Sequence, residues 1–287
     1  MGCGAKSMLN IGCGNDDIVL KFNTQLGGRA LARFWTSYGF LRAVPLIAGP
    51  GIAAAAIFWV HGSNLAIHGQ DYAEAPPTVS RALLDPGIAG PFAFAMAASA
   101  IFLAVAVFQV ASALGRCIKI TGKRTALLST VLLAVVVCEA IAIAGMVVLS
   151  QFTGKANPHL HDIGSYMLFF GHAIGISLAG LLIRRLLSVA DRLGALSGAS
   201  LNAFATLRKH PRRAGGVAVL SVLYGVVYFG GKQLPDEFFF WQRTAMSVLE
   251  VLVILSFLGF LVAFLPFLRV CALGASEGDD KSMIVTY

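Results

Sequence analysis

The sequence predicts an all-α, polytopic membrane protein with six transmembrane helices and both termini in the cytosol. Composition is the first reason, because 57% of the 287 residues are hydrophobic and only 13% are charged. The second reason is that six stretches with few or no charged residues are each long enough for a bilayer crossing, which takes about 20 residues. Their polarity does not alternate at every second position, so they do not resemble the strands of a membrane barrel.

The predicted helices divide the chain into three regions. Residues 1–42 form a cytosolic segment in which Arg29 and Arg33 lie beside Phe34 and Trp35, a combination typical of the membrane interface. Residues 43–270 form the membrane domain, and the polar tail of residues 271–287 is expected to be disordered. The predicted helices span residues 43–61, 88–114, 126–150, 163–184, 214–231 and 244–268.

The positions of Lys and Arg determine the predicted orientation. Of the 22 such residues, 18 lie on the side of the N-terminus, and the other four are Arg81, Lys155, Lys232 and Arg243. Because Lys and Arg accumulate on the cytosolic side of membrane proteins, we expect both termini there. The net charge of +8 therefore reflects topology and attraction to anionic lipid, since nucleic-acid binding would need a soluble basic surface.

A strongly basic cluster lies at the end of the long cytosolic loop between the fourth and fifth helices. It consists of Arg208, Lys209, Arg212 and Arg213. Each basic residue contributes about 1 kcal/mol near an anionic membrane surface, so we expect this loop to lie against the cytosolic leaflet. A protein partner is the alternative, and the sequence does not identify one.

Two carboxylates lie inside predicted helices, where a charged side chain costs roughly 2.5–3.5 kcal/mol. Glu250, in the sixth helix, either finds a partner inside the bundle or reaches interfacial water, since it lies close to the start of its hydrophobic stretch. Glu139, near the middle of the third helix, is expected to be neutral and hydrogen-bonded, because desolvation disfavours the charged form. A proton or ion relay is the other interpretation of Glu139.

The fourth helix combines small residues with a histidine. Gly171, Gly175 and Ala179 recur every four residues and predict a surface on which a neighbouring helix packs closely. His172 lies beside this surface and is the only histidine well inside a predicted helix, so a haem with two histidine ligands is not expected. No cofactor and no metal site is predicted, because the histidines of the outer face are scattered over loops.

Four positions are candidates for lipidation. Gly2 and Cys3 stand where N-myristoylation and a second acyl chain would be placed, although Lys6 occupies the position at which Ser or Thr is expected. Cys117 and Cys271 are juxtamembrane cysteines of the kind that carries palmitate, and a free thiol is the alternative.

Four groups of residues, in order along the chain, carry a resemblance to a known family. They are Phe34-Trp35 with Leu41 and Pro45, Pro77-Thr78-Val79-Ser80 with Pro91-Phe92, His161 with Gly164 and Phe169, and Glu250 with Ser256-Phe257 and Gly259-Phe260. Together with the helix count, they make the chain resemble the six-helix membrane proteins that include the damage-regulated autophagy modulators (DRAM) and the Golgi factor that remodels GPI-anchor lipids. Arg81 departs from the pattern, since autophagy-type members tend to carry Asp there.

The resemblance implies a non-enzymatic membrane protein that regulates autophagy, lysosomal or membrane-lipid processes through contacts with lipids and proteins. It also implies an endomembrane location, in lysosomes, endosomes or the Golgi, in preference to the plasma membrane, which is the alternative. The alternatives are a lipid-remodelling enzyme or factor of the GPI-anchor type, and a transporter of small solutes coupled to protons. Glu139, His161, His172 and Glu250 would form the polar machinery of either alternative.

His161 and Glu250 are predicted to meet. Each lies near the outer end of its helix, so the two side chains reach a similar depth in the membrane. We expect them to form a partly buried polar pair that holds two helices together or contacts a lipid head group.

Overall fold

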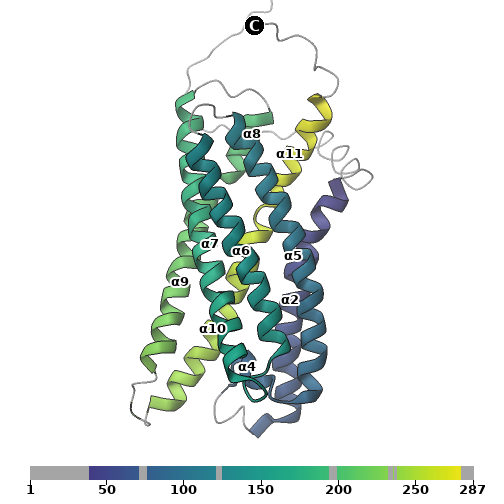
Figure 1. Cartoon of the computed structure of the whole chain (residues 1–287), viewed down its shortest axis with the longest axis vertical. Helices are drawn as coiled ribbons and strands as arrows, with labels where there is room; N and C mark the ends of the chain where they lie inside the picture. The colour runs from purple at the N-terminus through teal and green to yellow at the C-terminus, as the bar shows by residue number, and fades with distance from the viewer. Residues whose placement is uncertain are drawn as a thin grey trace, which may run out of the picture.

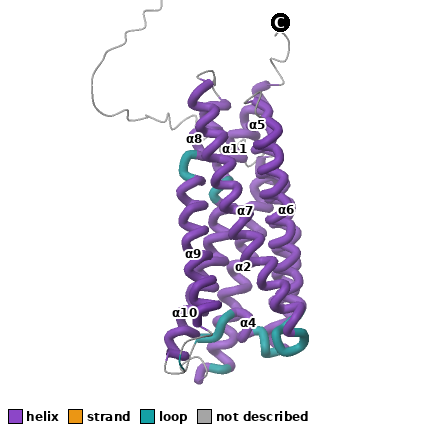
Figure 2. The backbone as a smooth tube through the Cα atoms, turned by 60° about the vertical axis from the view of Figure 1, so that its left-hand side comes forward, coloured by secondary structure: helices purple, strands orange, loops and turns teal. Residues whose placement is uncertain are grey.

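The computed structural model describes residues 39–70, 76–120, 125–193, 199–231, 235 and 238–278. These residues form helices and the short segments that connect them, and none of them is in a strand (Figures 1 and 2). Six helical stretches are long and apolar enough to cross a membrane. They are Ala43–Ile67, Pro86–Lys119, Ala126–Gln151, Pro158–Asp191, Asn202–Gly230 and Phe240–Cys271. The prediction of an all-helical chain with six candidate spans is confirmed for these residues.

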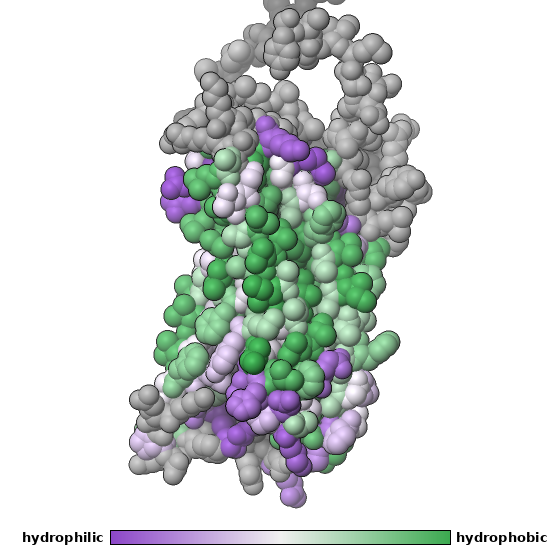
Figure 3. Space-filling view, in the orientation of Figure 1, coloured by the Kyte–Doolittle hydropathy of each residue, from purple (hydrophilic) through white to green (hydrophobic). Residues whose placement is uncertain are grey.

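The long helices lie side by side in one elongated bundle, and successive spans run in opposite directions (Figure 1). The helices are α2 (Gly39–Ile67), α4 (Val79–Ala82), α5 (Pro86–Ile120), α6 (Thr125–Gln151), α7 (Pro158–Leu193), α8 (Ala199–Leu207), α9 (His210–Gly230), α10 (Phe239–Val262) and α11 (Leu265–Gly278). We call the two ends of the bundle the α4 end and the α8 end. Figure 3 shows a belt of hydrophobic residues between more hydrophilic residues at the two ends.

Most helices extend beyond the stretches predicted from charge. For example, α7 covers Pro158–Leu193, whereas the sequence predicted 163–184, and α5 covers Pro86–Ile120 rather than 88–114. Arg and Lys form helices nearly as readily as Leu, so a helix continues through its charged ends. A charge-free stretch therefore indicates the part of a helix that fits inside a bilayer, and the helix itself begins before and ends after it.

The sixth span is two helices and not the single helix predicted over residues 244–268. Helix α10 ends at Val262, a turn follows at Ala263 and Phe264, and α11 begins at Leu265. Pro266 has no N–H to donate and its ring clashes with the carbonyl four residues earlier, so it is tolerated only in the first turn of a new helix. The sequence FLPF already contained this signal.

The C-terminal tail also differs from the prediction. Disorder was expected from residue 271, but α11 continues to Gly278. Ala272, Leu273 and Ala275 favour a helix, and no proline follows Pro266 to interrupt it. The remainder of the tail lies outside the described residues.

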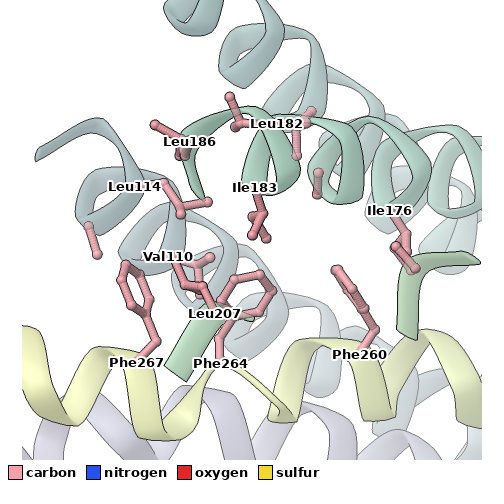
Figure 4. Packing of buried hydrophobic residues seen from close by; sticks show 14 of the residues in the cluster. Val110, Leu114, Ile176, Leu182, Ile183, Leu186, Leu207, Phe260, Phe264 and Phe267 are labelled. Carbon is pink, nitrogen blue, oxygen red and sulfur yellow. The ribbon is translucent and has the colours of Figure 1, made fainter. Parts of the chain in front are cut away.

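The break between α10 and α11 lies inside the larger hydrophobic core. Phe260, Phe264 and Phe267 are almost completely buried there. Figure 4 shows their rings pointing from α10, the turn and α11 towards leucine, isoleucine and valine side chains of α5, α7 and α8. Aromatic rings of this size fill the space that the change of helix direction would otherwise leave empty.

Helices α6 and α7 pack closely along their length. A methyl group placed on Gly145 of α6 would lie 2.6 Å from the backbone nitrogen of Leu168 and 2.8 Å from the carbonyl oxygen of Gly164. A methyl group on Gly164 of α7 would lie 2.6 Å from the backbone nitrogen of Leu149. Backbone therefore packs directly on backbone, an arrangement that membrane helices achieve with small residues.

Asp85 immediately precedes α5, and its carboxyl group interacts with a backbone amide and with a histidine. Its Oδ1 accepts a hydrogen bond from the Gly87 amide at 2.8 Å, and its Oδ2 lies 3.1 Å from Nε2 of His68. Pro86 occupies the first helical position, which is the usual arrangement after an aspartate N-cap. The Gly87 amide, and secondly the His68 imidazole, hold the pKa of Asp85 below its usual range.

We therefore expect Asp85 to stabilise the fold at neutral pH and to lose this contribution in acid. Because its pKa is lower in the folded chain, the contribution is complete above the unfolded value of about 3.9 and disappears as the pH falls through the folded value. Thermal unfolding of detergent-solubilised protein between pH 7 and pH 3 tests this expectation. The Asp85→Asn variant keeps an N-cap and should lose less stability below about pH 4 than the parent chain. If the parent chain and Asp85→Asn lost the same stability in acid, the ionised Asp85 would contribute nothing to the stability of the fold.

Candidate functional site

A large pocket opens between α7, α9 and α10, with the segment around α4 at one end. Its volume is about 590 Å³, within the range of small-molecule sites. Helix α9 packs on both α7 and α10 and so forms the third wall. The lining residues are Thr78, Ser80, Arg81, His161, Asp162, Ser165, Tyr166, Phe169, Phe170, Ala173, Ile174, Ser177, Leu178, Ala218, Ser221, Val222, Tyr224, Gly225, Tyr228, Phe229, Met246, Glu250 and Val253.

Polar groups are concentrated at the α4 end of this pocket. Thr78, Ser80 and Arg81 come from α4 and the residues before it, and His161 and Asp162 from the first turn of α7. Farther along the bundle, the walls of the pocket become apolar. Ile174 and Leu178 line it from α7, and Val222 lines it from α9, helices that are labelled in Figure 1. From His161 to Leu178 the lining follows α7 for about 26 Å at a rise of about 1.5 Å per residue. The pocket is therefore elongated along the bundle and amphipathic.

The serines in the apolar part are satisfied by their own helices. The Ser177 hydroxyl donates to the Ala173 carbonyl at 2.7 Å, and the Ser221 hydroxyl donates to the Val217 carbonyl at 2.8 Å. Because both donors are already used within their own helices, these side chains add little polarity to the wall.

Glu250 holds the α4 segment against α10. The Val79 amide, in the first turn of α4, donates to Oε2 of Glu250 at 2.8 Å, and the Ser247 hydroxyl donates to the Pro77 carbonyl at 2.7 Å. Ser247 and Glu250 are three residues apart on α10, so they present both groups on one face. Sequence reasoning predicted a partner for Glu250 but did not identify a backbone amide from the first loop.

One oxygen of the Glu250 carboxyl is not used by the fold. Glu250 is only 4% exposed, and its Oε1 makes no hydrogen bond to any described residue. The residue lines the pocket, so this oxygen is available to an occupant. This oxygen is not one of the fully buried atoms without a partner among the described residues, so it is open to the pocket, where a donor of an occupant can reach it.

The predicted direct pair of His161 and Glu250 is not formed. The Nδ1–H of His161 donates instead to the carbonyl oxygen of Phe152, at 2.8 Å. Phe152 directly follows α6, where the last carbonyls of a helix lack donors within the helix. His161 therefore caps α6, while Glu250 binds the amide of Val79. Both residues nevertheless line the same pocket.

Glu139 and His172 form a buried pair that the sequence analysis did not propose. Oε2 of Glu139 lies 2.8 Å from Nδ1 of His172, and about nine-tenths of each side chain is buried. A separate small cavity of about 50 Å³ lies beside the pair and is otherwise lined by apolar residues of α5, α6, α7 and α10. The His172 ring also packs on Phe257 of α10, with 4.9 Å between ring centroids. The pair thus links the middle of α6 and α7 to α10.

The small residues of α7 lie at this pair. A methyl group on Gly171 would meet the backbone nitrogen of Ala142 on α6 at 2.9 Å, and one on Gly175 would meet Oε1 of Glu139 at 2.6 Å. Gly175 therefore leaves the space that the Glu139 carboxyl occupies. Ala179 is buried in the larger core and lines the small cavity.

The lipidation candidates have different surroundings. Gly2 and Cys3 lie outside the described residues. Cys117 is only 4% exposed and belongs to the hydrophobic core, so its thiol does not point to the surface where an acyl chain would lie. Burial thus argues against palmitoylation of Cys117. Cys271 is half-buried and packs against the same core.

The basic cluster is exposed at the α8 end. Arg208, Lys209, Arg212 and Arg213 all have exposed side chains at the start of α9, and Arg208 lies 3.5 Å from Asp191. His210, within the same stretch, is instead buried against Phe264, with 4.3 Å between ring centroids. The stretch is therefore amphipathic.

Comparisons with known proteins do not assign a relative. No family model, no curated protein and no solved structure matches the chain. The family resemblance that the sequence motifs carry remains a prediction.

Proposed function

We propose that this chain is a non-enzymatic, lipid-binding membrane protein that regulates autophagy, lysosomal or membrane-lipid processes by holding one lipid in the pocket between α7, α9 and α10. The observation that carries the proposal is the shape and polarity of this pocket. It is polar at the α4 end and apolar along the bundle, which matches a lipid with its head group at one end and its acyl chains along the helices. The regulatory role is proposed from the family resemblance that the sequence motifs carry.

The orientation proposed from Lys and Arg places the α4 end on the non-cytosolic side. The polar end of the pocket then lies at the level of the head groups of the lumenal or outer leaflet. The four basic residues at the start of α9 lie at the opposite, cytosolic surface, where anionic lipid would attract them. We propose an endomembrane, such as the lysosomal, endosomal or Golgi membrane, as the location.

The hydrogen bonds around the pocket support a binding role over a catalytic one. The Ser165 hydroxyl donates to the carbonyl oxygen of His161, at 2.9 Å, and not to the imidazole. The imidazole of His161 is itself held by the Phe152 carbonyl. An acyl-transfer enzyme would pair a nucleophile with a base, and these two side chains are arranged otherwise.

Blocking the pocket is expected to abolish retention of the lipid without unfolding the protein. Gly225 lines the pocket, and a methyl group there would meet no atom within 4 Å, so a larger side chain extends into open space. Native mass spectrometry of the purified chain should therefore detect a bound lipid in the parent and a loss of about tenfold or more in Gly225→Trp.

Gly216→Trp is the matched control, because Gly216 lies on the same helix, has equally open surroundings and does not line the pocket. It should retain lipid as the parent does. Equal retention by the parent, Gly225→Trp and Gly216→Trp would show that lipid binds elsewhere and would refute the proposal.

A further inference from the structure

The charged groups around the pocket constrain the head group that it accepts. Glu250 presents to the pocket a carboxyl oxygen that accepts no hydrogen bond from a described residue, and the exposed Asp162 adds a second carboxyl group at the α4 end. Arg81 and His161 line the same end, with the imidazole already donating to Phe152. An occupant of this end therefore meets acceptor oxygens, which favour a hydrogen-bond donor, and the guanidinium of Arg81, which favours an anion.

These groups lie in a fixed order. The Val79 amide, two residues before Arg81, binds Glu250, so the α4 segment brings the exposed Arg81 to the edge of the pocket and Glu250 to its interior. The ammonium of a phospholipid lies beyond its phosphate as seen from the acyl chains. The head group therefore lies across this end of the pocket, with its phosphate near Arg81 and its ammonium turned towards Glu250, while the acyl chains extend along α7.

We propose that the pocket selects a zwitterionic phospholipid with a primary ammonium group, the phosphatidylethanolamine class, which binds its phosphate to Arg81 and donates ammonium N–H groups to Glu250. This inference rests on the proposed lipid-binding function and names the class of lipid. A quaternary ammonium has no N–H, so a phosphatidylcholine cannot satisfy the free oxygen of Glu250. A neutral hydroxyl head group supplies a donor but no positive charge, so its hydrogen bond to Glu250 is weaker than that of an ammonium.

Competition between two lipids tests the proposal. The full-length chain is loaded from an equimolar mixture of phosphatidylethanolamine and phosphatidylcholine with identical acyl chains, and bound lipid is measured by native mass spectrometry. Phosphatidylethanolamine is expected to be enriched about tenfold, because a hydrogen bond to a charged group contributes about that much to discrimination. In Glu250→Gln the amide oxygen still accepts from Val79, and its NH₂ group replaces the free acceptor. The enrichment should therefore disappear.

Two further variants separate the roles of the polar groups. Arg81→Gln should weaken retention of both lipids severalfold and leave their ratio unchanged, because both carry a phosphate. Ser247→Ala removes the second hydrogen bond between α10 and the α4 segment without altering the pocket lining, and should leave the ratio unchanged. A ratio that collapses in Ser247→Ala as well would assign the selectivity to the position of α4 and overturn the role of Glu250.

Soluble phosphoethanolamine distinguishes a lipid from a free head group. In excess, it should not displace the bound lipid, because it makes no contact with the apolar part of the pocket; complete displacement would overturn the assignment to a lipid. Lipid bound with no head-group preference would overturn the present inference and leave the proposed function standing. Absence of bound lipid from the parent chain would overturn both.

Discussion

Replacing Gly145 by leucine is expected to lower the free energy of unfolding by more than about 3 kcal/mol, the largest effect predicted for any single substitution in this chain. The first added carbon would lie 2.6 Å from the Leu168 nitrogen, which belongs to the backbone and cannot rotate away. Relief of this overlap therefore requires α6 and α7 to separate at this contact. Unfolding of the detergent-solubilised protein in increasing concentrations of sodium dodecyl sulfate measures the change.

Gly259→Leu is the matched control for this prediction. Gly259 lies in α10, also in a candidate span, and a methyl group there meets no atom within 4 Å. Its replacement should change the free energy of unfolding little, apart from the modest gain in helix propensity. If the two variants were equally stable, α6 and α7 would not pack as closely as described.

Removing His172 has the second largest expected effect. In His172→Leu, Oε2 of Glu139 loses its partner in an apolar environment, which should cost about 1–3 kcal/mol of unfolding free energy. Much of this cost comes from the polar group left behind and not from the lost bond itself. The double variant Glu139→Leu, His172→Leu should therefore be less destabilised than the sum of the two single variants.

A double-mutant cycle with the same unfolding measurement tests this coupling. We expect a coupling free energy of about 0.6 kcal/mol, and at most about 1.7 kcal/mol, between the two positions, as double-mutant cycles find for hydrogen bonds between membrane helices. Strictly additive single effects would show that Glu139 and His172 do not act as a pair. Gly175→Ala offers an independent check, because its methyl group would approach Oε1 of Glu139 and should disturb the same pair.

The pairing of Glu139 with His172 was within reach of the sequence. The two helices are antiparallel and joined by a short connection between Gln151 and Pro158, so residues at similar distances from that connection lie at the same depth. Glu139 and His172 satisfy this condition approximately, and the small residues beside His172 predicted a close neighbour. Each of the two residues was interpreted on its own from the sequence, so the pair was not predicted. Pro266 was a comparable signal for the break between α10 and α11.

The partner of Glu250 was not within reach of the sequence. The Val79 amide is a backbone group 171 residues away, and its position depends on how α4 folds across the end of the bundle. Composition and charge-free length established the helical class and the six candidate spans, because these depend on local hydrophobicity alone. The pocket depends on the separation of α7 from α10 and on the place of α9 between them, which no local pattern encodes.

A structure of the full-length chain in lipid nanodiscs by electron cryo-microscopy would test the central claim most directly. We predict elongated density between α7, α9 and α10, with its polar end against Glu250 and Arg81 and its tail along Ile174 and Leu178. The Gly225→Trp chain, reconstituted in the same way, should lack this density. A pocket that holds only water in the parent chain, or one that α9 closes by moving onto α7 and α10, would contradict the proposal that this protein works by holding a lipid.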